Sequence, residues 1–301
     1  MSQIEELQSS FPYKSVTFSQ ENDVILLDIQ NKSCTARISM QGAHLMFWKP
    51  SEQSHPVVWL SEDAKIAPLK SIRGGVPVCW PWFGPHESSS TYPAHGYART
   101  VPWDLLKIEE EGTDLTRLIF RITDSEALKV LWPYSCNLDL TLSLGSTLQV
   151  DLTTTNTGKE EFVIGEALHT YFHIGDIEQI SIEGLDRTEY IDKVDQHARK
   201  NQSGEIRFSS EVDRVYVNTN SECSILDSVL RRKIRISKSG SLSTVVWTPW
   251  KEKADSMGDM GKNDGWKQMV CVETANALEN CKKVSPGSKH TLTAIYKAET
   301  I

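Results

Sequence analysis

The chain has 301 residues, with 32 lysines and arginines against 40 aspartates and glutamates, which gives a formal charge of −8 with histidine neutral. This acidic balance disfavours a nucleic-acid partner, because binding to the phosphate backbone requires basic side chains gathered on one face. With 39% hydrophobic and 24% charged residues, the composition excludes a disordered chain and supports a full hydrophobic core.

No stretch approaches about 18 uninterrupted apolar residues, and the first residues lack the basic and apolar regions of a secretory signal. We therefore expect a cytoplasmic protein that does not enter a membrane. A prior of about 150 residues per domain allows two domains, but all-β domains commonly reach roughly 200–250 residues. Because no linker or change of composition divides the chain, we expect one domain over residues 1–301. No pattern indicates an interface, so we expect a monomer.

The six cysteines are spread along the chain without a Cys-x-x-Cys pair or a tight cluster. Such spacing is typical neither of a disulfide-rich secreted domain nor of a zinc site, so we expect reduced and mostly buried cysteines. The basic triplet at residues 231–233 is interpreted as the solvated end of a strand.

In chain order, the first elements are one short helix and one pair of strands. Residues 4–7 have a short helical pattern. Residues 24–29 and 35–40 indicate two strands that pair with each other.

The clearest alternation is at residues 138–144, where leucine at every second position alternates with Asp, Thr and Ser. This period of two predicts a half-buried strand. Gly145 and Ser146 then precede a second alternating strand at residues 148–152. The spacing predicts a hairpin with a two-residue loop of type II′, which places glycine first.

The second half of the chain continues with short strands. Residues 233–237 and 244–247 indicate another strand pair, and residues 251–266 form a polar, glycine-containing stretch that we interpret as a loop. Residues 276–281 have a short helical pattern, and residues 291–296 predict a closing strand. Many short strands with few helices predict an all-β fold of packed antiparallel sheets.

Three segments join cationic side chains to aromatic rings: residues 73–86 (RGGVPVCWPWFGPH), 95–99 (HGYAR) and 166–173 (EALHTYFH). A sugar site needs flat rings for its C–H faces and fixed polar groups for its hydroxyls, so this mixture favours a carbohydrate ligand. The alternative interpretation is that Trp80, Trp82 and Trp103 fill the core at turns made rigid by neighbouring prolines, and for any one tryptophan alone this is the favoured interpretation.

Several other chemistries lack their motifs. Neither phosphate-loop pattern nor a G-x-S-x-G elbow occurs. His169 and His173 resemble a metal pair, but the segment indicates a strand, where residues four apart lie about 13 Å apart. Acid and base chemistry remains, with His169 able to titrate near neutral pH. Glu273 and Asp213 are carboxylates in apolar strands, although such groups also occur in salt bridges.

The segments resemble the aldose 1-epimerase (galactose mutarotase-like) superfamily and, within it, the hexose-6-phosphate mutarotases, also called glucose-6-phosphate 1-epimerases. The resemblance covers most of the chain and implies a large antiparallel β-supersandwich. It rests on residues 41–44 (QGAH), 72–84 (IRGGVPVCWPWFG), 95–99 (HGYAR), 168–172 (LHTYF), 188–216 ending in DRVY, and 271–273 (CVE).

The resemblance implies that His169 is the general acid and Glu273 the general base for exchange of the α and β anomers of glucose 6-phosphate. The base removes the proton of the C1 hydroxyl while the acid protonates the ring oxygen, so the C1–O5 bond breaks and can close on the other face. It implies no metal and no organic cofactor. His95, Asp213 and Gln41 match sugar-binding positions.

Arg73 and Arg99 match arginines of the sugar-phosphate branch, where a guanidinium can hold phosphate with two hydrogen bonds. The structural alternative for Arg99 is a salt bridge to a nearby carboxylate such as Asp104, and Lys262 can also reach a phosphate. Two other functions stay open: a 1-epimerase of free aldoses, and a sugar-phosphate binding module without chemistry. A comparison of substrates with and without phosphate separates the first from the leading hypothesis.

Overall fold

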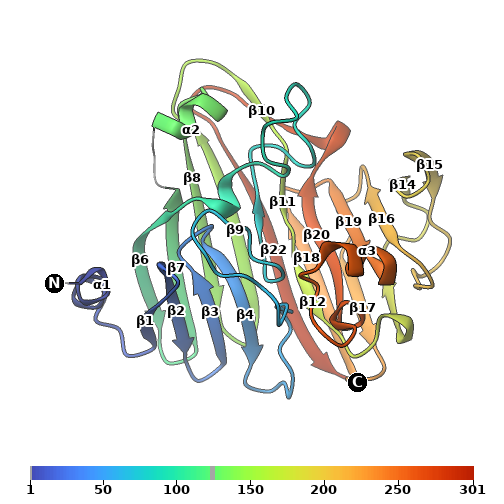
Figure 1. The fold of residues 1–301 in the computed structure, drawn as a ribbon, viewed down its shortest axis with the longest axis horizontal. Helices are drawn as coiled ribbons and strands as arrows, with labels where there is room; N and C mark the ends of the chain where they lie inside the picture. The colour runs from blue at the N-terminus through green and yellow to red at the C-terminus, as the bar shows by residue number, and fades with distance from the viewer. Residues whose placement is uncertain (1, 123–125) are drawn as a thin grey trace.

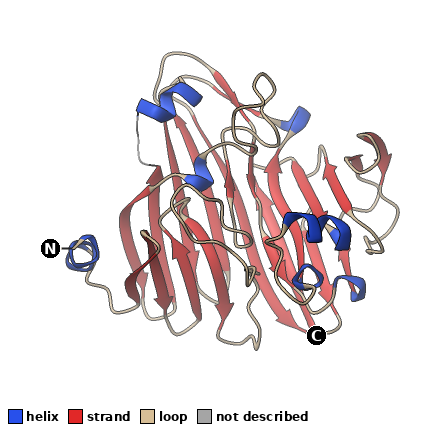
Figure 2. Cartoon of the chain, viewed as in Figure 1, coloured by secondary structure: helices blue, strands red, loops and turns tan. Residues whose placement is uncertain are grey.

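The computed structural model describes residues 2–122 and 126–301, and its regular structure is mainly strands (Figures 1 and 2). The paired strands of its sheets are antiparallel, and the two largest sheets have eight strands each. The predicted all-β sandwich of antiparallel sheets is therefore confirmed.

The first large sheet, here the long sheet, brings together strands from the middle and the end of the chain. It has the order β13 (Ile180–Glu183), β17 (Cys223–Asp227), β18 (Arg232–Ser239), β22 (Lys289–Thr300), β9 (Leu148–Asn156), β8 (Cys136–Leu144), β7 (Leu115–Ile122), β6 (Trp103–Glu111). A separate sheet near the N-terminus has the order β1 (Val16–Glu21), β2 (Val24–Gln30), β3 (Cys34–Ser39), β4 (His44–Pro50).

The second large sheet, here the site sheet, carries most of the candidate site. It has the order β15 (Ala198–Asn201), β14 (Glu189–Asp192), β16 (Val212–Tyr216), β19 (Ser243–Thr248), β20 (Met269–Asn276), β11 (Glu166–Leu168), β5 (Val78–Cys79), and β12 (Tyr171–His173) also pairs with β20. A small sheet pairs β10 (Phe162–Ile164) with β21 (Lys282–Val284).

Helices are short and lie outside the sheets (Figure 2). The α-helices are α1 (Gln3–Ser10), α2 (Glu126–Leu131) and α3 (Trp250–Met257), and the 3-10 helices are η1 (Ala98–Thr100), η2 (Ile177–Gln179), η3 (Gly265–Gln268) and η4 (Leu278–Asn280). Within the two described ranges, no helix is long and apolar enough to cross a bilayer.

The leucine alternation produces the predicted hairpin of β8 and β9. Leu138, Leu140, Leu142 and Leu144 are at most 1% exposed, so their common face packs into the core. The predicted loop was wrong in length, because Leu144 pairs with Leu148 and three residues lie between them. Gly145 also lacks the positive φ that a type II′ turn requires.

The N-terminal expectations are confirmed, since β2 pairs with β3 and a helix covers residues 4–7. The expected pairing of residues 233–237 with 244–247 is wrong, because β18 lies in the long sheet and β19 in the site sheet. The chain changes sheets at Gly240, which has φ +66°, and a Cβ there would lie 2.0 Å from the Thr291 carbonyl oxygen. Glycine thus permits this crossing.

The last expected elements are partly confirmed. The closing strand is real, but β22 lies in the middle of the long sheet between β18 and β9 (Figure 1). Residues 251–266 are not one loop, because they contain most of α3 and part of η3. At residues 276–281 the helical turn is confined to η4.

The cysteines are free, as expected, with four of them buried, Cys136 half-buried and Cys281 exposed. The basic triplet contradicts its interpretation at Arg232, which is 2% exposed. Its guanidinium donates hydrogen bonds to the carbonyl oxygens of His55, Pro56 and His173. A buried arginine therefore anchors the loop that follows β4 to the end of β12.

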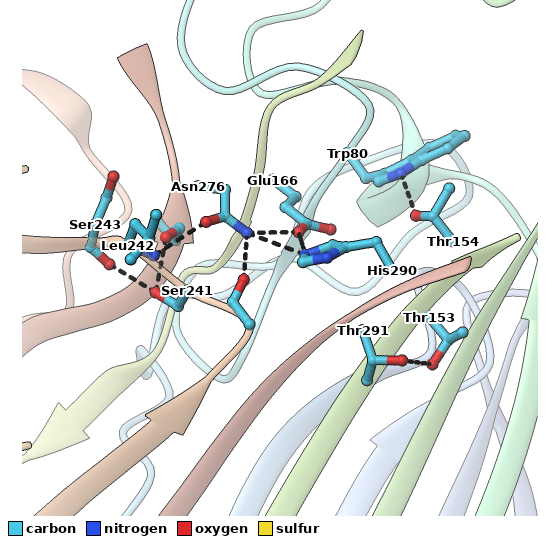
Figure 3. A network of polar contacts seen from close by, with 12 residues as sticks. Trp80, Thr153, Thr154, Glu166, Ser241, Leu242, Ser243, Asn276, His290 and Thr291 are labelled. Atoms are coloured by element: carbon cyan, nitrogen blue, oxygen red, sulfur yellow. Dashed lines mark hydrogen bonds and ion pairs between the residues drawn. The ribbon is translucent and has the colours of Figure 1, made fainter. Parts of the chain in front are cut away.

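Polar contacts around Asn276 join the site sheet to the long sheet (Figure 3). The Asn276 amide donates to Glu166 Oε1 and to the Gly240 carbonyl oxygen, each at 2.8 Å. Nε2 of His290, on β22, lies 2.8 Å from the same Glu166 oxygen. Because Glu166 opens β11, this network fixes the strand that leads directly to His169.

Candidate active site

A cavity of about 300 Å³ opens on the site sheet beside α3. Its walls combine charged groups with aromatic and aliphatic side chains. The lining residues are Ser71, Ile72, Arg73, Pro77, Phe83, His95, Arg99, His169, Tyr171, Lys193, Asp213, Val245, Trp247, Lys253, Met257 and Glu273.

Strand alternation places Glu273 in this cavity. Successive side chains of a strand point to opposite faces, so Val270 and Val272 join the core while Glu273 points the other way. The neighbouring strand β19 pairs Val245 with Glu273, and both line the cavity. A carboxylate in an apolar strand is unusual, and its position in the wall of a polar cavity explains it.

His169 follows β11 and is held in a fixed orientation. Its backbone N–H donates to the Pro77 carbonyl oxygen at 3.0 Å. Its ring stacks on Tyr171, with centroids 5.0 Å apart and planes 10° apart, and meets Trp247 edge-on at 6.0 Å. Burial lowers the pKa of His169 well below 6.5, and the positive charges of nearby groups, including Arg99, act in the same direction.

The acid and base candidates are in contact. Nε2 of His169 lies 3.4 Å from Oε1 of Glu273, whose side chain is 1% exposed. Burial raises the pKa of Glu273 well above 4.5, opposed by the positive charge of Lys193. Among the described residues, neither Nδ1 of His169 nor Oε2 of Glu273 has a hydrogen-bond partner. Both groups therefore have capacity left for a ligand in the cavity.

His95 lies beside this pair, with its ring centroid 5.8 Å from that of His169. The Gly84 N–H donates to Nδ1 of His95 at 3.3 Å, so the neutral ring carries its proton on Nε2. Burial lowers the pKa of His95 to about 3, helped by the charge of Arg99. His95 is thus a neutral hydrogen-bond donor rather than a cation.

Asp213 on β16 is paired with a residue that the sequence did not single out. Its Oδ1 lies 3.4 Å from Nζ of Lys193, which also lies 5.3 Å from the centroid of the Phe83 ring. Lys193 follows β14 without a motif, so no sequence signal marks it. Lys253 was missed for a different reason, since it is on α3, in a segment interpreted as a loop.

Arg73 is tied on two sides. Its Nε donates to Oδ1 of Asp259 at 3.0 Å, and a terminal nitrogen donates to the Tyr171 hydroxyl oxygen at 3.0 Å. These partners raise the pKa of Arg73, so it stays positively charged. Because Tyr171 stacks on His169, the arginine also supports the orientation of the candidate acid.

Arg99, on η1, uses one terminal nitrogen to donate to the Ala94 carbonyl oxygen at 2.9 Å. In residues 2–122 and 126–301, no ion pair joins Arg99 to Asp104, so the structural alternative is not observed. The cavity therefore has four cationic side chains, on Arg73, Arg99, Lys193 and Lys253, against two carboxylates, on Asp213 and Glu273. This balance suits an anionic ligand.

Two expected ligand-binding residues lie elsewhere. The Gln41 amide donates to the carbonyl oxygens of Ala67 and Lys70 at 3.1 and 2.8 Å and accepts from the Leu69 N–H at 2.7 Å. It therefore holds the loop that precedes the cavity wall. Lys262 is 76% exposed, pairs with Asp63 at 3.6 Å and does not line the cavity.

Some of the tryptophans considered for a sugar site lie in the core and do not line the cavity. Trp80 and Trp103 are each 1% exposed and fill the core, as their alternative interpretation stated. The aromatic side chains of the cavity are instead Phe83, Tyr171 and Trp247.

Comparison with known proteins gives consistent matches. The family model for aldose 1-epimerase matches residues 25–297. A protein of Escherichia coli strain K12, provisionally named glucose-6-phosphate 1-epimerase, is 41% identical over 283 residues, which cover 93% of this chain and 92% of that protein. A Cenchrus ciliaris protein of the same provisional name is 34% identical over 295 residues, covering 94% and 87%.

A solved structure agrees with the fold. The crystal structure of a provisionally named mutarotase from Salmonella typhimurium superposes with a TM-score of 0.90 at 32% identity, covering 96% of this chain and 95% of that one. Fold, cavity and matches together define a β-sandwich isomerase that acts on carbohydrates. The chain belongs to the aldose 1-epimerase family.

Proposed function

We propose that this protein interconverts the α and β anomers of glucose 6-phosphate by opening and closing the sugar ring. The observation that carries the proposal is the contact between His169 Nε2 and Glu273 Oε1, 3.4 Å apart, in a cavity with a cationic majority. The E. coli and Cenchrus relatives bear the name of this activity.

The two side chains match the two protons that must move. In the cyclic sugar, the ring oxygen O5 and the hydroxyl oxygen O1 are both bonded to C1, so a paired acid and base can reach both. Glu273 takes the O1 proton and His169 protonates O5, and the C1–O5 bond breaks to give the open aldehyde. Rotation about C1–C2 and closure with the reverse proton transfers give the other anomer.

Burial explains why the pair can work in both directions. It lowers the pKa of His169 and raises that of Glu273, so the neutral pair becomes accessible beside the ion pair. The ion pair is the state that opens the ring. The neutral pair, with the proton on Glu273, is the state left after opening and the one that closes the ring.

The remaining cavity groups bind the rest of the substrate in this proposal. Neutral His95 donates to a sugar hydroxyl, and Asp213 accepts from another. Arg73 and Arg99 hold the phosphate, because a guanidinium fork presents two donors to a phosphate group. The cavity volume of about 300 Å³ is of the size of small-ligand sites.

The test is NMR magnetisation exchange between anomers at equilibrium, for glucose 6-phosphate and for glucose, with catalytic amounts of protein. Faster exchange of the phosphorylated sugar alone is the expected result. Equal acceleration of both sugars would show a 1-epimerase of free aldoses instead. Binding of glucose 6-phosphate without acceleration would leave a sugar-phosphate binding module.

A further inference from the structure

A buried thiol lies beside the acid and base candidates. Cys271 is two residues before Glu273 on β20, so strand alternation puts both side chains on one face of the sheet. One ligand atom from each of His169, Cys271 and Glu273 lies within 4.8 Å of the other two. Cys271 is 0% exposed and has no part in the proposed proton transfers.

The separation of the first two ligands suits a tetrahedral metal ion. Nitrogen and oxygen ligands about 2.0–2.1 Å from one tetrahedral zinc ion lie about 3.4 Å from each other. The observed distance between His169 Nε2 and Glu273 Oε1 is 3.4 Å. A thiolate about 2.3 Å from the same ion would lie roughly 3.6 Å from the other two ligand atoms, so binding requires the sulfur of Cys271, which is within 4.8 Å of both, to move closer by at most about 1.2 Å.

Ligand atoms without a hydrogen-bond partner also favour a metal ion at this position. Glu273 is 2% exposed, and its Oε2 has no hydrogen-bond partner among the described residues. Because Glu273 and His169 line the cavity, the fourth coordination position of an ion between them faces open space. An imidazole, a thiolate and a carboxylate together form a ligand set that zinc accepts.

We propose that His169, Cys271 and Glu273 form an inhibitory binding site for zinc and similar thiol-binding divalent cations. The ion replaces the thiol proton of Cys271 and any proton shared by His169 and Glu273, and these protons leave to solvent. With both catalytic groups coordinated, neither can transfer a proton to or from a sugar.

The surrounding charge makes this site reversible rather than a permanent metal centre. Arg73, Arg99 and Lys193 line the same cavity and repel a divalent cation. His169 Nδ1 lacks the second hydrogen bond that normally orients a metal-bound imidazole. A chelator should therefore restore activity. Metal binding itself does not depend on the proposed function, whereas inhibition does.

The probe is Cd²⁺, whose bond to a thiolate gives an ultraviolet charge-transfer band, titrated into the full chain carrying Cys281→Ser to remove the exposed thiol. We expect one equivalent to produce the band and Cys271→Ala to abolish it. The matched control is Cys223→Ala, a buried cysteine outside this cluster of three residues, which should keep the band. Zn²⁺ should slow anomer exchange in the same protein, and EDTA should reverse the effect.

Absence of the band in the parent protein, or its persistence in Cys271→Ala, would overturn the proposal. If circular dichroism shows that Cys271→Ala does not fold, His169→Asn tests the metal site instead. Loss of one ligand should weaken Cd²⁺ binding at least about tenfold. Unchanged Cd²⁺ affinity in His169→Asn would equally refute the site. A protein that binds Cd²⁺ through Cys271 but exchanges no anomers would contradict the proposed function and leave the metal site standing.

Discussion

Arg73 and Arg99 enter the cavity under different constraints. Arg73 is held by Asp259 and by the Tyr171 hydroxyl, whereas Arg99 is held at one nitrogen by a backbone carbonyl. Arg73 thus couples the wall of the cavity to His169 through Tyr171. Arg99 has more donors available for a ligand.

Replacing either arginine by alanine should weaken the binding of glucose 6-phosphate more than the binding of glucose. Charge-assisted hydrogen bonds contribute about 1.5–3 kcal/mol each, so KM for glucose 6-phosphate should rise about tenfold or more in Arg99→Ala. Arg73→Ala should also lower kcat, because it releases Tyr171. The control is Arg37→Ala, which removes an exposed arginine paired with Asp28. Equal losses for both sugars would refute a phosphate role.

A buried histidine should make stability depend on acid pH. His44 is 1% exposed, lies with Nε2 2.8 Å from the Gly74 carbonyl oxygen, and has its pKa lowered to about 4 by burial. The unfolded chain, with a His pKa near 6.5, binds the proton first. Stability is therefore full above about pH 6.5 and falls as pH decreases toward 4, by about 3 kcal/mol from this group.

Urea unfolding between pH 7 and pH 4 measures this effect. His44→Gln should flatten the decline, although its stability at pH 7 is also expected to fall. The exposed His197 offers the control, since His197→Gln should leave the pH dependence unchanged. A decline of equal steepness in His44→Gln would contradict the assignment.

At the scale of elements, the loop that follows β4 depends on a side chain from the long sheet. Arg232 opens β18 and donates to the carbonyl oxygens of His55, Pro56 and His173. β12 pairs with β20, the strand that carries Glu273. The arginine therefore links the long sheet to the elements that position the candidate site.

Arg232→Ala should lower the free energy of unfolding by about 3 kcal/mol or more, because three carbonyl oxygens lose a charged donor and the buried side chain leaves a cavity. Equilibrium urea denaturation gives the value. The neighbouring Arg231 is exposed with φ +51°, so Arg231→Asn serves as a control that tolerates this backbone and should be nearly neutral. A loss below about 1 kcal/mol in Arg232→Ala would show that these hydrogen bonds matter little.

At the scale of the whole molecule, we expect one cooperative domain over residues 1–301, which stays a prediction. One core cluster contains residues of both large sheets, such as Leu140 and Val272, so neither sheet keeps its buried face alone. Calorimetry should give a single transition whose calorimetric and van't Hoff enthalpies agree. Two resolved transitions would divide the chain into separate domains.

Local patterns predicted the parts of this fold that are decided locally. The leucine alternation at residues 138–144 determines β8, because only one face of that strand meets the core. The crossing between β18 and β19 was missed because Ser-Gly-Ser fits a hairpin turn and a change of sheet equally well. Neighbouring sheets, and not the turn itself, decide between the two.

For the candidate site too, the sequence indicated the residues that belong to motifs and missed those that tertiary packing brings in. His169, Glu273, His95, Asp213 and both arginines lie together in the cavity, as the resemblance implied, although their roles stay proposals. Lys193 and Lys253 reach the cavity through tertiary packing and leave no local signal. The Gln41 amide contacts a loop outside the cavity, which a short polar motif cannot distinguish from contact with a ligand.

The most direct test of the central claim compares anomer exchange of glucose 6-phosphate in His169→Asn, Glu273→Gln and the double variant. Each single change should lower turnover by at least about 10², the scale of a lost acid or base, while His173→Asn, outside the cavity, keeps it. Because the two groups act as one unit, the double variant should lose little more than the weaker single variant. Unchanged turnover in either single variant, or losses that multiply in the double variant, would contradict a shared acid–base pair.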